Sequence, residues 1–419
     1  MPLHLYAPSL THYPPPMSRL PEVARLFTKL GFTAFGGPVA HLAMMEDETV
    51  NKRGWLDRRH FLDMVAAINF IPGPNSTQLA IHLGFLRAGV PGLVVAGICF
   101  IVPAVLIILP LAWAYVTYGH TPQIREALVG INACVVAIVA AALWRFARTG
   151  VKDRFSATIA ALAVVGGFLA DPVVARWLRT HHGVLAPFSE GLARGQGNLV
   201  ILALAAMAGA IWYGQPKISS TLPAMLPLGI LHADPHFVKM ALLFLKVGAT
   251  LFGSGYVLVS YLQAGIVDEY GWMTKTQLLD AIAVGQVTPG PLLTTATFIG
   301  YFLGHARFGG GVGGGIAGGL LATAAIFLPS FILIALLGPL LPAIRKNPTA
   351  RGALNGMNAA VVAMIFVVCI RLGAAALTDV TTILIAVASL AALLIANVNA
   401  TWLILLSGGA GVMRMWIHR

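Results

Sequence analysis

Two lysines stand in otherwise apolar segments, and the same pattern follows each of them. After one intervening residue, Lys29 and Lys246 both precede Gly-x-Thr-x-Phe-Gly. A charge near the middle of a membrane helix costs roughly 2.5–3.5 kcal/mol on insertion scales, so such a residue usually has a function. The alternative is that each lysine extends to the nearest polar interface. Two lysines of this kind would favour an anionic ligand.

A Pro-Gly-Pro tripeptide also occurs twice, at 72–74 and 289–291. Proline lacks an amide hydrogen and restricts the residue before it, so the first proline should end one helix and the second suits the first turn of the next. The amides that follow would lack helical partners and would favour an anion. The predicted hinges are Pro72, Gly73, Pro74, Pro289, Gly290 and Pro291.

Hydroxyl and amide side chains cluster around both tripeptides, which is unusual in apolar helices. We take these as candidate substrate-binding residues: Asn69, Asn75, Ser76, Thr77, Gln286, Thr294 and Thr295. Small residues after the lysines permit close approach of a ligand, although packing explains them equally well: Gly36, Gly37, Gly253 and Ser254. Asn132 and Asn358, in matching apolar segments, are predicted to contact either the same site or a neighbouring backbone.

Three charged residues have other candidate roles. Asp63 and Asp280 recur at matching positions, and each is either a helix-terminus acid or a proton-coupling carboxylate. Arg53 lies beside Gly54-Trp55, but its counterpart is Tyr270, which indicates a gate or entry residue rather than a symmetric ligand. No metal-ligand set, nucleophile elbow or phosphate loop occurs. We therefore expect no metal, no cofactor and no enzymatic activity.

Composition places these residues in a membrane protein. Of the 419 residues, 58% are hydrophobic and 10% are charged, against about 25% charged in a soluble domain. The net charge of +12 is spread over segment ends, which indicates topology signals and contacts with the lipid bilayer rather than nucleic acid. The three cysteines lie in apolar runs and are expected to be core residues.

The chain contains an internal repeat. At an offset of 217, 15 of the 48 positions from 27 to 74 are identical, including both tripeptides and both Gly-Trp pairs. Farther on the offset becomes 226, which aligns ALVGINACVVA at 127 with ALNGMNAAVVA at 353. We divide the chain into a tail (1–19), a first repeat (20–215), a linker (216–234) and a second repeat (235–419).

The expected fold is all-α and polytopic. Segments 57–71 and 75–89 are shorter than the roughly 20 residues needed to span a bilayer, so they should form a re-entrant or broken-helix hairpin. Each repeat would then have five crossings and one hairpin, giving about ten transmembrane helices and two hairpins. An odd number of crossings inverts the second repeat. Loop charges agree, because 51–60 holds four Lys or Arg and 268–277 holds one Lys and two acids.

Two long stretches carry a resemblance to a known family. They read FGGPVAHLAMMEDETVNKRGWLDRRHFLDMVAAINFIPGPNSTQLAIHLGF from residue 35 and FGSGYVLVSYLQAGIVDEYGWMTKTQLLDAIAVGQVTPGPLLTTATFIGY from residue 252. The chain resembles the chromate ion transporter family of bacteria in its long two-domain form. The resemblance implies a multi-pass protein of the bacterial inner membrane that exports chromate from the cytoplasm and confers chromate resistance.

A single central site would fit this substrate. Chromate is a tetrahedral dianion, and we hypothesise that Lys29 and Lys246 supply charge while the helix ends after the two tripeptides supply amides. Sulfate, which has the same shape and would compete with chromate, or another tetrahedral oxyanion would suit the same geometry. The alternative function is therefore a transporter of such an oxyanion, including one that works in uptake. A passive anion channel or a membrane scaffold is the alternative from a different class. A homodimer is also compatible with the sequence.

Overall fold

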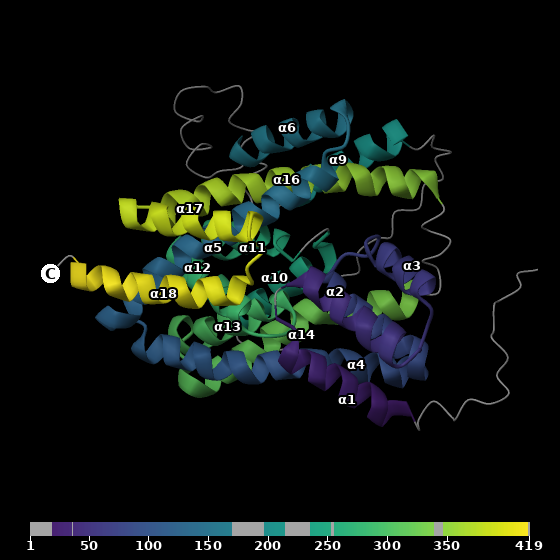
Figure 1. Ribbon diagram of the computed structural model, residues 1–419, viewed down its shortest axis with the longest axis horizontal. Helices are drawn as coiled ribbons and strands as arrows, with labels where there is room; N and C mark the ends of the chain where they lie inside the picture. The colour runs from purple at the N-terminus through teal and green to yellow at the C-terminus, as the bar shows by residue number, and fades with distance from the viewer. Residues whose placement is uncertain are drawn as a thin grey trace, which may run out of the picture.

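The computed structural model describes residues 19–35, 37–169, 197–213, 235–252, 255–338 and 347–417, and within these ranges all regular structure is helical (Figure 1). The first half contains α1 (Leu20–Thr33), α2 (Pro38–Glu46), the π-helical η2 (Asp47–Lys52), α3 (Arg58–Ile68), α4 (Asn75–Tyr118), α5 (Pro122–Gly150), α6 (Arg154–Leu169) and α9 (Gly197–Tyr213).

The second half follows a similar order. It contains α10 (Pro235–Thr250), α11 (Val257–Leu262), the π-helical η3 (Gln263–Glu269), α12 (Lys275–Val287), the 3-10 turn η4 (Leu292–Thr294), α13 (Thr295–Phe302), the π-helical η5 (Leu303–Arg307), α14 (Gly311–Leu337), α16 (Pro348–Ala376), α17 (Val380–Leu394) and α18 (Ala400–Ile417). The two halves pack into one bundle of roughly aligned helices (Figure 1).

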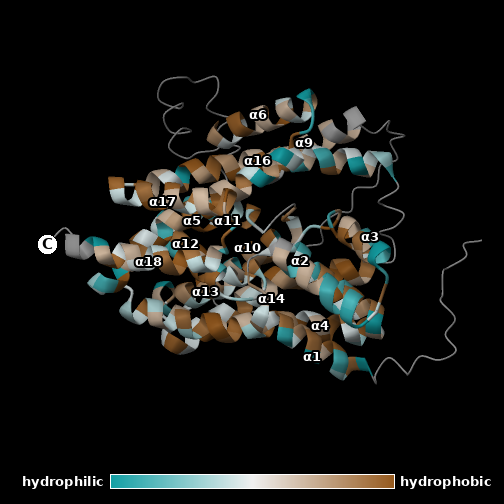
Figure 2. Cartoon of the chain, viewed as in Figure 1, coloured by the Kyte–Doolittle hydropathy of each residue, from teal (hydrophilic) through white to brown (hydrophobic). Residues whose placement is uncertain are grey.

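Four helices in the described part of the chain are long and apolar enough to cross a membrane. They are α4, α5, α14 and α16. Their residues are rich in Leu, Ile, Val and Ala. Hydrophobic residues make up much of the bundle, while hydrophilic residues gather where η2 and α3 lie (Figure 2). The chain is therefore a multi-pass, all-α membrane protein. The sequence predicts about ten crossings, whereas length and composition alone identify these four.

The helix that carries Lys29 does not cross the membrane alone, contrary to expectation. At 1.5 Å per residue, the 14 residues of α1 extend about 21 Å, which is less than the bilayer core of about 30 Å. The helix stops at Thr33, Gly37 adopts a positive φ of 81°, and Pro38 begins α2. Glycine allows this reversal and proline starts the next helix, so the first repeat has a second break before the tripeptide.

The predicted break at the first tripeptide is confirmed. Helix α3 ends at Ile68 and α4 begins at Asn75. Pro74 is the residue immediately before α4, so it does not occupy the first turn of that helix as expected. The predicted short segment 75–89 is the first part of α4, which bends sharply at Ala88 and Gly89, where Gly89 has a φ of 65°.

Candidate functional site

The broken helices of the two halves meet through a reciprocal pair of backbone hydrogen bonds. The Gly73 amide donates to the carbonyl oxygen of Leu251 at 2.6 Å, and the Gly290 amide donates to the carbonyl oxygen of Ala34 at 2.9 Å. At the offset of 217, Gly290 is the equivalent of Gly73, and Leu251 is the equivalent of Ala34. Each tripeptide is therefore fastened to the break that follows α1 or α10 in the other half.

Glycine is required at the centre of the first tripeptide. Gly73 has a φ of 128°, a conformation that side chains rarely adopt. A Cβ added there would lie 2.5 Å from both Gln78 Nε2 and Ser330 Oγ. Gln78 Nε2 donates to the Pro72 carbonyl oxygen at 2.6 Å, so that neighbour is itself fixed. The hinge is consequently a close contact between the break, α4 and α14.

A cavity of about 380 Å³ lies beside this break, where α3 ends and α4 begins. Asn75 Nδ2 donates to Asn69 Oδ1 at 2.7 Å, and no side chain caps the start of α4. The polar side chains that line the cavity are Asn69, Asn75, Ser76, Thr149, Lys152 and Asn358. Five neutral hydrogen-bonding groups, one cation and an uncapped helix start can together bind an anion of modest size.

The second tripeptide contributes differently from the first. Its short turn η4 places Leu292 and Leu293 on the wall of the same cavity. Thr294 Oγ1 donates to the Pro291 carbonyl oxygen at 2.6 Å, and Thr295 Oγ1 donates to that of Leu292 at 2.8 Å. Both hydroxyl groups therefore donate their hydrogen atoms to nearby backbone carbonyl groups rather than to a ligand. The predicted pair of equal helix ends therefore becomes one polar end and one apolar wall.

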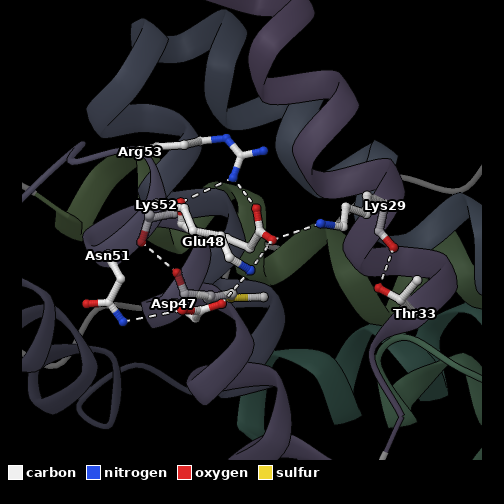
Figure 3. Close-up of polar contacts among 9 residues, drawn as sticks. Lys29, Thr33, Asp47, Glu48, Asn51, Lys52 and Arg53 are labelled. Carbon is white, nitrogen blue, oxygen red and sulfur yellow. Dashed lines mark hydrogen bonds and ion pairs between the residues drawn. The ribbon is translucent and has the colours of Figure 1, made fainter.

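Lys29 belongs to an ion cluster rather than to the cavity lining. Its Nζ donates to Glu48 Oε1 at 2.8 Å, Lys52 Nζ donates to the same oxygen at 3.2 Å, and Arg53 donates to Glu48 Oε2 (Figure 3). Glu48 lies outside the four long apolar helices. The hydrogen bond from Lys29 outweighs the burial of the carboxylate and, with those from Arg53 and Lys52, lowers the pKa of Glu48 to about 2. The carboxylate is thus ionised at physiological pH.

Comparison of the two repeats does not single out Glu48, because its equivalent in the second half is Gly265. The signal that could have found it is local, since an acid four residues before Lys52 forms a pair on one helix face. Arg53 is joined to the same acid rather than standing alone. Lys246 is half-buried in α10 and does not line the cavity.

Asp280 and Asn132 meet on the wall of a second cavity of about 700 Å³. Asn132 Nδ2 donates to Asp280 Oδ1 at 2.8 Å, and the Tyr115 hydroxyl donates to Asp280 Oδ2 at 2.7 Å. The structure therefore places Asn132 away from the cavity that its counterpart Asn358 lines. Sequence reasoning missed Tyr115, whose equivalent is Leu341.

The remaining candidates divide by position. Thr77 and Gln286 are buried and do not line the 380 Å³ cavity, and Asp63 is half-buried on α3. Gly37 forms the reversal before α2. Gly36, Gly253 and Ser254 lie outside the described residues.

Long apolar helices, interrupted helices that meet inside the bundle, and a polar cavity at their break define a multi-pass membrane protein of the transporter type. Comparison with known proteins agrees. The chromate transporter family model matches residues 21–231 and 238–412, and the chain belongs to that family.

Curated relatives match over most of their length. A chromate transport protein of Cupriavidus metallidurans is 30% identical, covering 90% of this chain and 89% of the relative. A probable chromate transport protein of Synechococcus elongatus is also 30% identical, covering 91% of both chains. A chromate transport protein of Pseudomonas aeruginosa is 30% identical, covering 84% of this chain and 80% of the relative. No solved structure matches the chain.

Proposed function

We propose that this protein exports chromate from the cytoplasm across the inner membrane of a bacterium and thereby confers chromate resistance. Membership of the chromate transporter family supports the substrate, as do the names of the three relatives. The observation that carries the proposal within this chain is the 380 Å³ cavity at the first helix break, with its single lysine and uncapped helix start.

The cavity has the donors that a tetrahedral dianion requires. Asn69, Asn75 and Asn358 offer amide groups, and Ser76 and the α4 helix start offer further donors. Lys152 supplies the positive charge, a role that the sequence assigns to Lys29 and Lys246. Charge-assisted hydrogen bonds to an oxyanion are about twice as strong as neutral ones, so Lys152 should contribute most among the side chains.

The two repeats, 20–215 and 235–419, are proposed to have opposite orientations. The reciprocal hydrogen bonds of Gly73 and Gly290 join equivalent positions in both directions, as a pseudo-two-fold axis would require. The cavity near the end of α5 includes Lys152, while the 700 Å³ cavity near its start includes Arg125 together with the start of α12. The end of α3 therefore lies near the C-terminal end of α5, and the start of α12 lies near its N-terminal end.

The charge at one end of α5 supports the proposed direction of transport. Arg145, Arg148, Lys152 and Arg154 lie at or just beyond the C-terminal end of α5, beside the 380 Å³ cavity. Basic residues favour the cytoplasmic side of a membrane. The cavity would then open to the cytoplasm, ready to bind chromate for export. The cluster of Lys29, Lys52 and Arg53 around Glu48 would attract anions on the way in.

The test is chromate flux in inside-out membrane vesicles. Radiolabelled chromate should accumulate in vesicles that contain the protein, and only when a proton or electrical gradient is imposed. Sulfate should compete less well than unlabelled chromate. Preferential sulfate accumulation would replace chromate by another oxyanion, gradient-independent equilibration would indicate a channel, and no flux of either anion would indicate a scaffold.

A further inference from the structure

We propose that Asp280, Asn132 and Tyr115 form a closed gate on the face opposite the substrate cavity, and that Asp63 and Asn358 form the equivalent gate when the protein opens the other way. This inference rests on the proposed function, because it assigns how access to the same site is controlled. It makes Asn132 and Tyr115 positioning residues of the transport cycle.

The closed gate joins the two halves of the protein. Asp280 lies on α12, while Tyr115 and Asn132 lie on α4 and α5 of the first half. The Asp280 side chain receives one hydrogen bond on each carboxylate oxygen, at 2.7 and 2.8 Å, and the residue is only 4% exposed. Removing either donor would leave a buried carboxyl group short of a partner, so the three residues hold the helices together.

The gate lines the cavity that lies opposite the substrate cavity. It forms part of the wall of the 700 Å³ cavity, whose other lining residues include Gly119, His120 and Arg125 at the junction of α4 and α5. The substrate cavity reaches α5 near Thr149, which is 17 residues beyond Asn132. Seventeen residues of helix extend about 26 Å. A solute bound near Asn75 is therefore separated from the 700 Å³ cavity by the contact of α12 with α5.

The matching residues on the other face are arranged differently. Asp63 is equivalent to Asp280 at the offset of 217, and Asn358 is equivalent to Asn132 at the offset of 226. Asn358 lines the open substrate cavity and makes no side-chain hydrogen bond within the described residues. Asp63 is half-buried, whereas Asp280 is almost completely buried. The same pair of residue types is joined on one face and not on the other.

Because equivalent residue pairs are arranged differently in the two repeats, we infer a second conformation in which the two arrangements are exchanged. In transporters built from inverted repeats, the two halves exchange conformations around a fixed site. Exchange here would bring Asp63 of α3 against Asn358 of α16 and would separate Asp280 from Asn132. The substrate cavity would close to the cytoplasm and open to the opposite face.

Paired cysteines test both gates in the full-length protein. Cys99, Cys134 and Cys369 are first replaced by alanine. One variant then carries Asp280→Cys with Asn132→Cys, and the other carries Asp63→Cys with Asn358→Cys. Membranes are treated with a short bifunctional thiosulfonate reagent. A mismatched variant, Asp63→Cys with Asn132→Cys, and the four single-cysteine variants serve as controls.

We expect both matched pairs to cross-link and the mismatched pair not to. An added Thr149→Cys should react with a membrane-impermeant maleimide in inside-out vesicles when the Asp280 gate is locked, and should be protected when the Asp63 gate is locked. Failure of the Asp63 and Asn358 pair to cross-link, or equal labelling of Thr149→Cys in both locked forms, overturns the proposal. Cross-linking is independent of the anion carried, so cross-links without chromate flux would reject the proposed function and leave the gates standing.

Exchanging the two residues of the closed gate is a second test that needs no cysteine. Asp280→Asn and Asn132→Asp alone should each lower the transport rate by about tenfold, whereas the double exchange restores the pair and should recover most of that loss. Protein amount and thermal unfolding are measured in parallel. A double variant no better than the worse single variant contradicts the pairing.

Discussion

At the scale of single residues, charge is distributed differently from what repetition of the sequence suggests. Lys29 is matched by Lys246, but its ammonium group is joined to Glu48, which has no counterpart. Lys152 has no lysine counterpart and nevertheless lines the cavity. Comparison of the repeats identifies the residues that both halves share. A binding site formed where the two halves meet also uses residues that occur in one half alone.

The first prediction concerns Lys152. Replacing it by alanine removes the cation from the cavity, and a hydrogen bond to a charged group contributes about 1.5–3 kcal/mol, so kcat/KM for chromate should fall about tenfold or more. Lys152→Arg should retain most of the activity. Arg154→Ala removes an exposed charge two residues away and should have little effect. Equal losses in Lys152→Ala and Arg154→Ala would show that only net charge matters.

The second prediction concerns Glu48. Glu48→Gln leaves Lys29, Lys52 and Arg53 without their shared carboxylate and should lower the free energy of unfolding by roughly 1–3 kcal/mol, measured in detergent with a denaturant. The pKa of Glu48 is lowered from 4.5 to about 2, so its contribution is complete above about pH 4.5 and is lost as the pH falls towards 2. The difference between wild type and variant should be constant from pH 6 to 8. Asp47→Asn, at an exposed pair with Lys52, is the control and should cost less.

At the scale of elements, the interrupted helices are the part of the fold that positions the site. Helices α3 and α12 end before the tripeptides, where proline disfavours a helical conformation in the residue that precedes it and glycine adopts a positive φ at both hinges. The freed amides of Gly73 and Gly290 bond carbonyl groups that the ends of α10 and α1 leave available. The broken helices of each half thus provide hydrogen-bond partners for the backbone groups of the other half, which is required where no water is available inside a bilayer.

The third prediction concerns these hinges. Gly73→Ala places a Cβ against Gln78 and Ser330, so chromate export should fall at least tenfold, with partial loss of protein from the membrane. Gly54→Ala is the matched control, because Gly54 also has a positive φ, of 58°, but nothing lies within 4 Å of an added Cβ. Gly54 lies in the left-handed region that L residues adopt at modest cost, so Gly73→Ala carries the larger backbone cost in addition to the close contact. Comparable defects in both variants would mean that the close contact at Gly73 is unimportant.

At the scale of the whole molecule, two cavities of different volume lie near opposite ends of α5. The 380 Å³ cavity includes Lys152, and the 700 Å³ cavity includes Arg125. At the larger cavity, Asn132 is hydrogen-bonded to Asp280, whereas the equivalent Asn358 and Asp63 are not hydrogen-bonded to each other. The molecule is consequently unequal on its two faces even though its halves are related in sequence.

The fourth prediction concerns orientation. In a cysteine-free background, Lys152→Cys should react with a membrane-impermeant thiol reagent in inside-out vesicles and not in intact cells. Arg125→Cys should show the opposite behaviour, because basic residues gather at the Lys152 end and mark it as cytoplasmic. Labelling of both positions from the same side would reject the inverted arrangement, and labelling with the sides exchanged would reverse the direction of transport.

The membrane class, the helix breaks and the family could all be predicted from the sequence. Low charge and long apolar runs require a bilayer. Proline and glycine together interrupt the helix at both tripeptides, whereas the single prolines Pro103 and Pro329 lie inside α4 and α14. These properties depend on residues close together in the chain, so short stretches are sufficient to show them. The end of α1 at Thr33 does not follow from the sequence, because a small residue such as Gly37 suits close packing as well as the reversal that its positive φ produces before α2.

The composition of the cavity and the partner of each ion were decided by tertiary structure. Lys29 could meet Glu48 only once α1 and η2 lay side by side, and Asp280 could meet Tyr115 only across 165 residues of chain. Hydrogen bonds depend on distances of about 3 Å, and the spacing of two residues along a chain does not determine that distance once the chain has folded back on itself. Sequence determined that the helices break and that the protein lies in a membrane. Folding decided which of the polar groups near those breaks face a common cavity and which pair with one another.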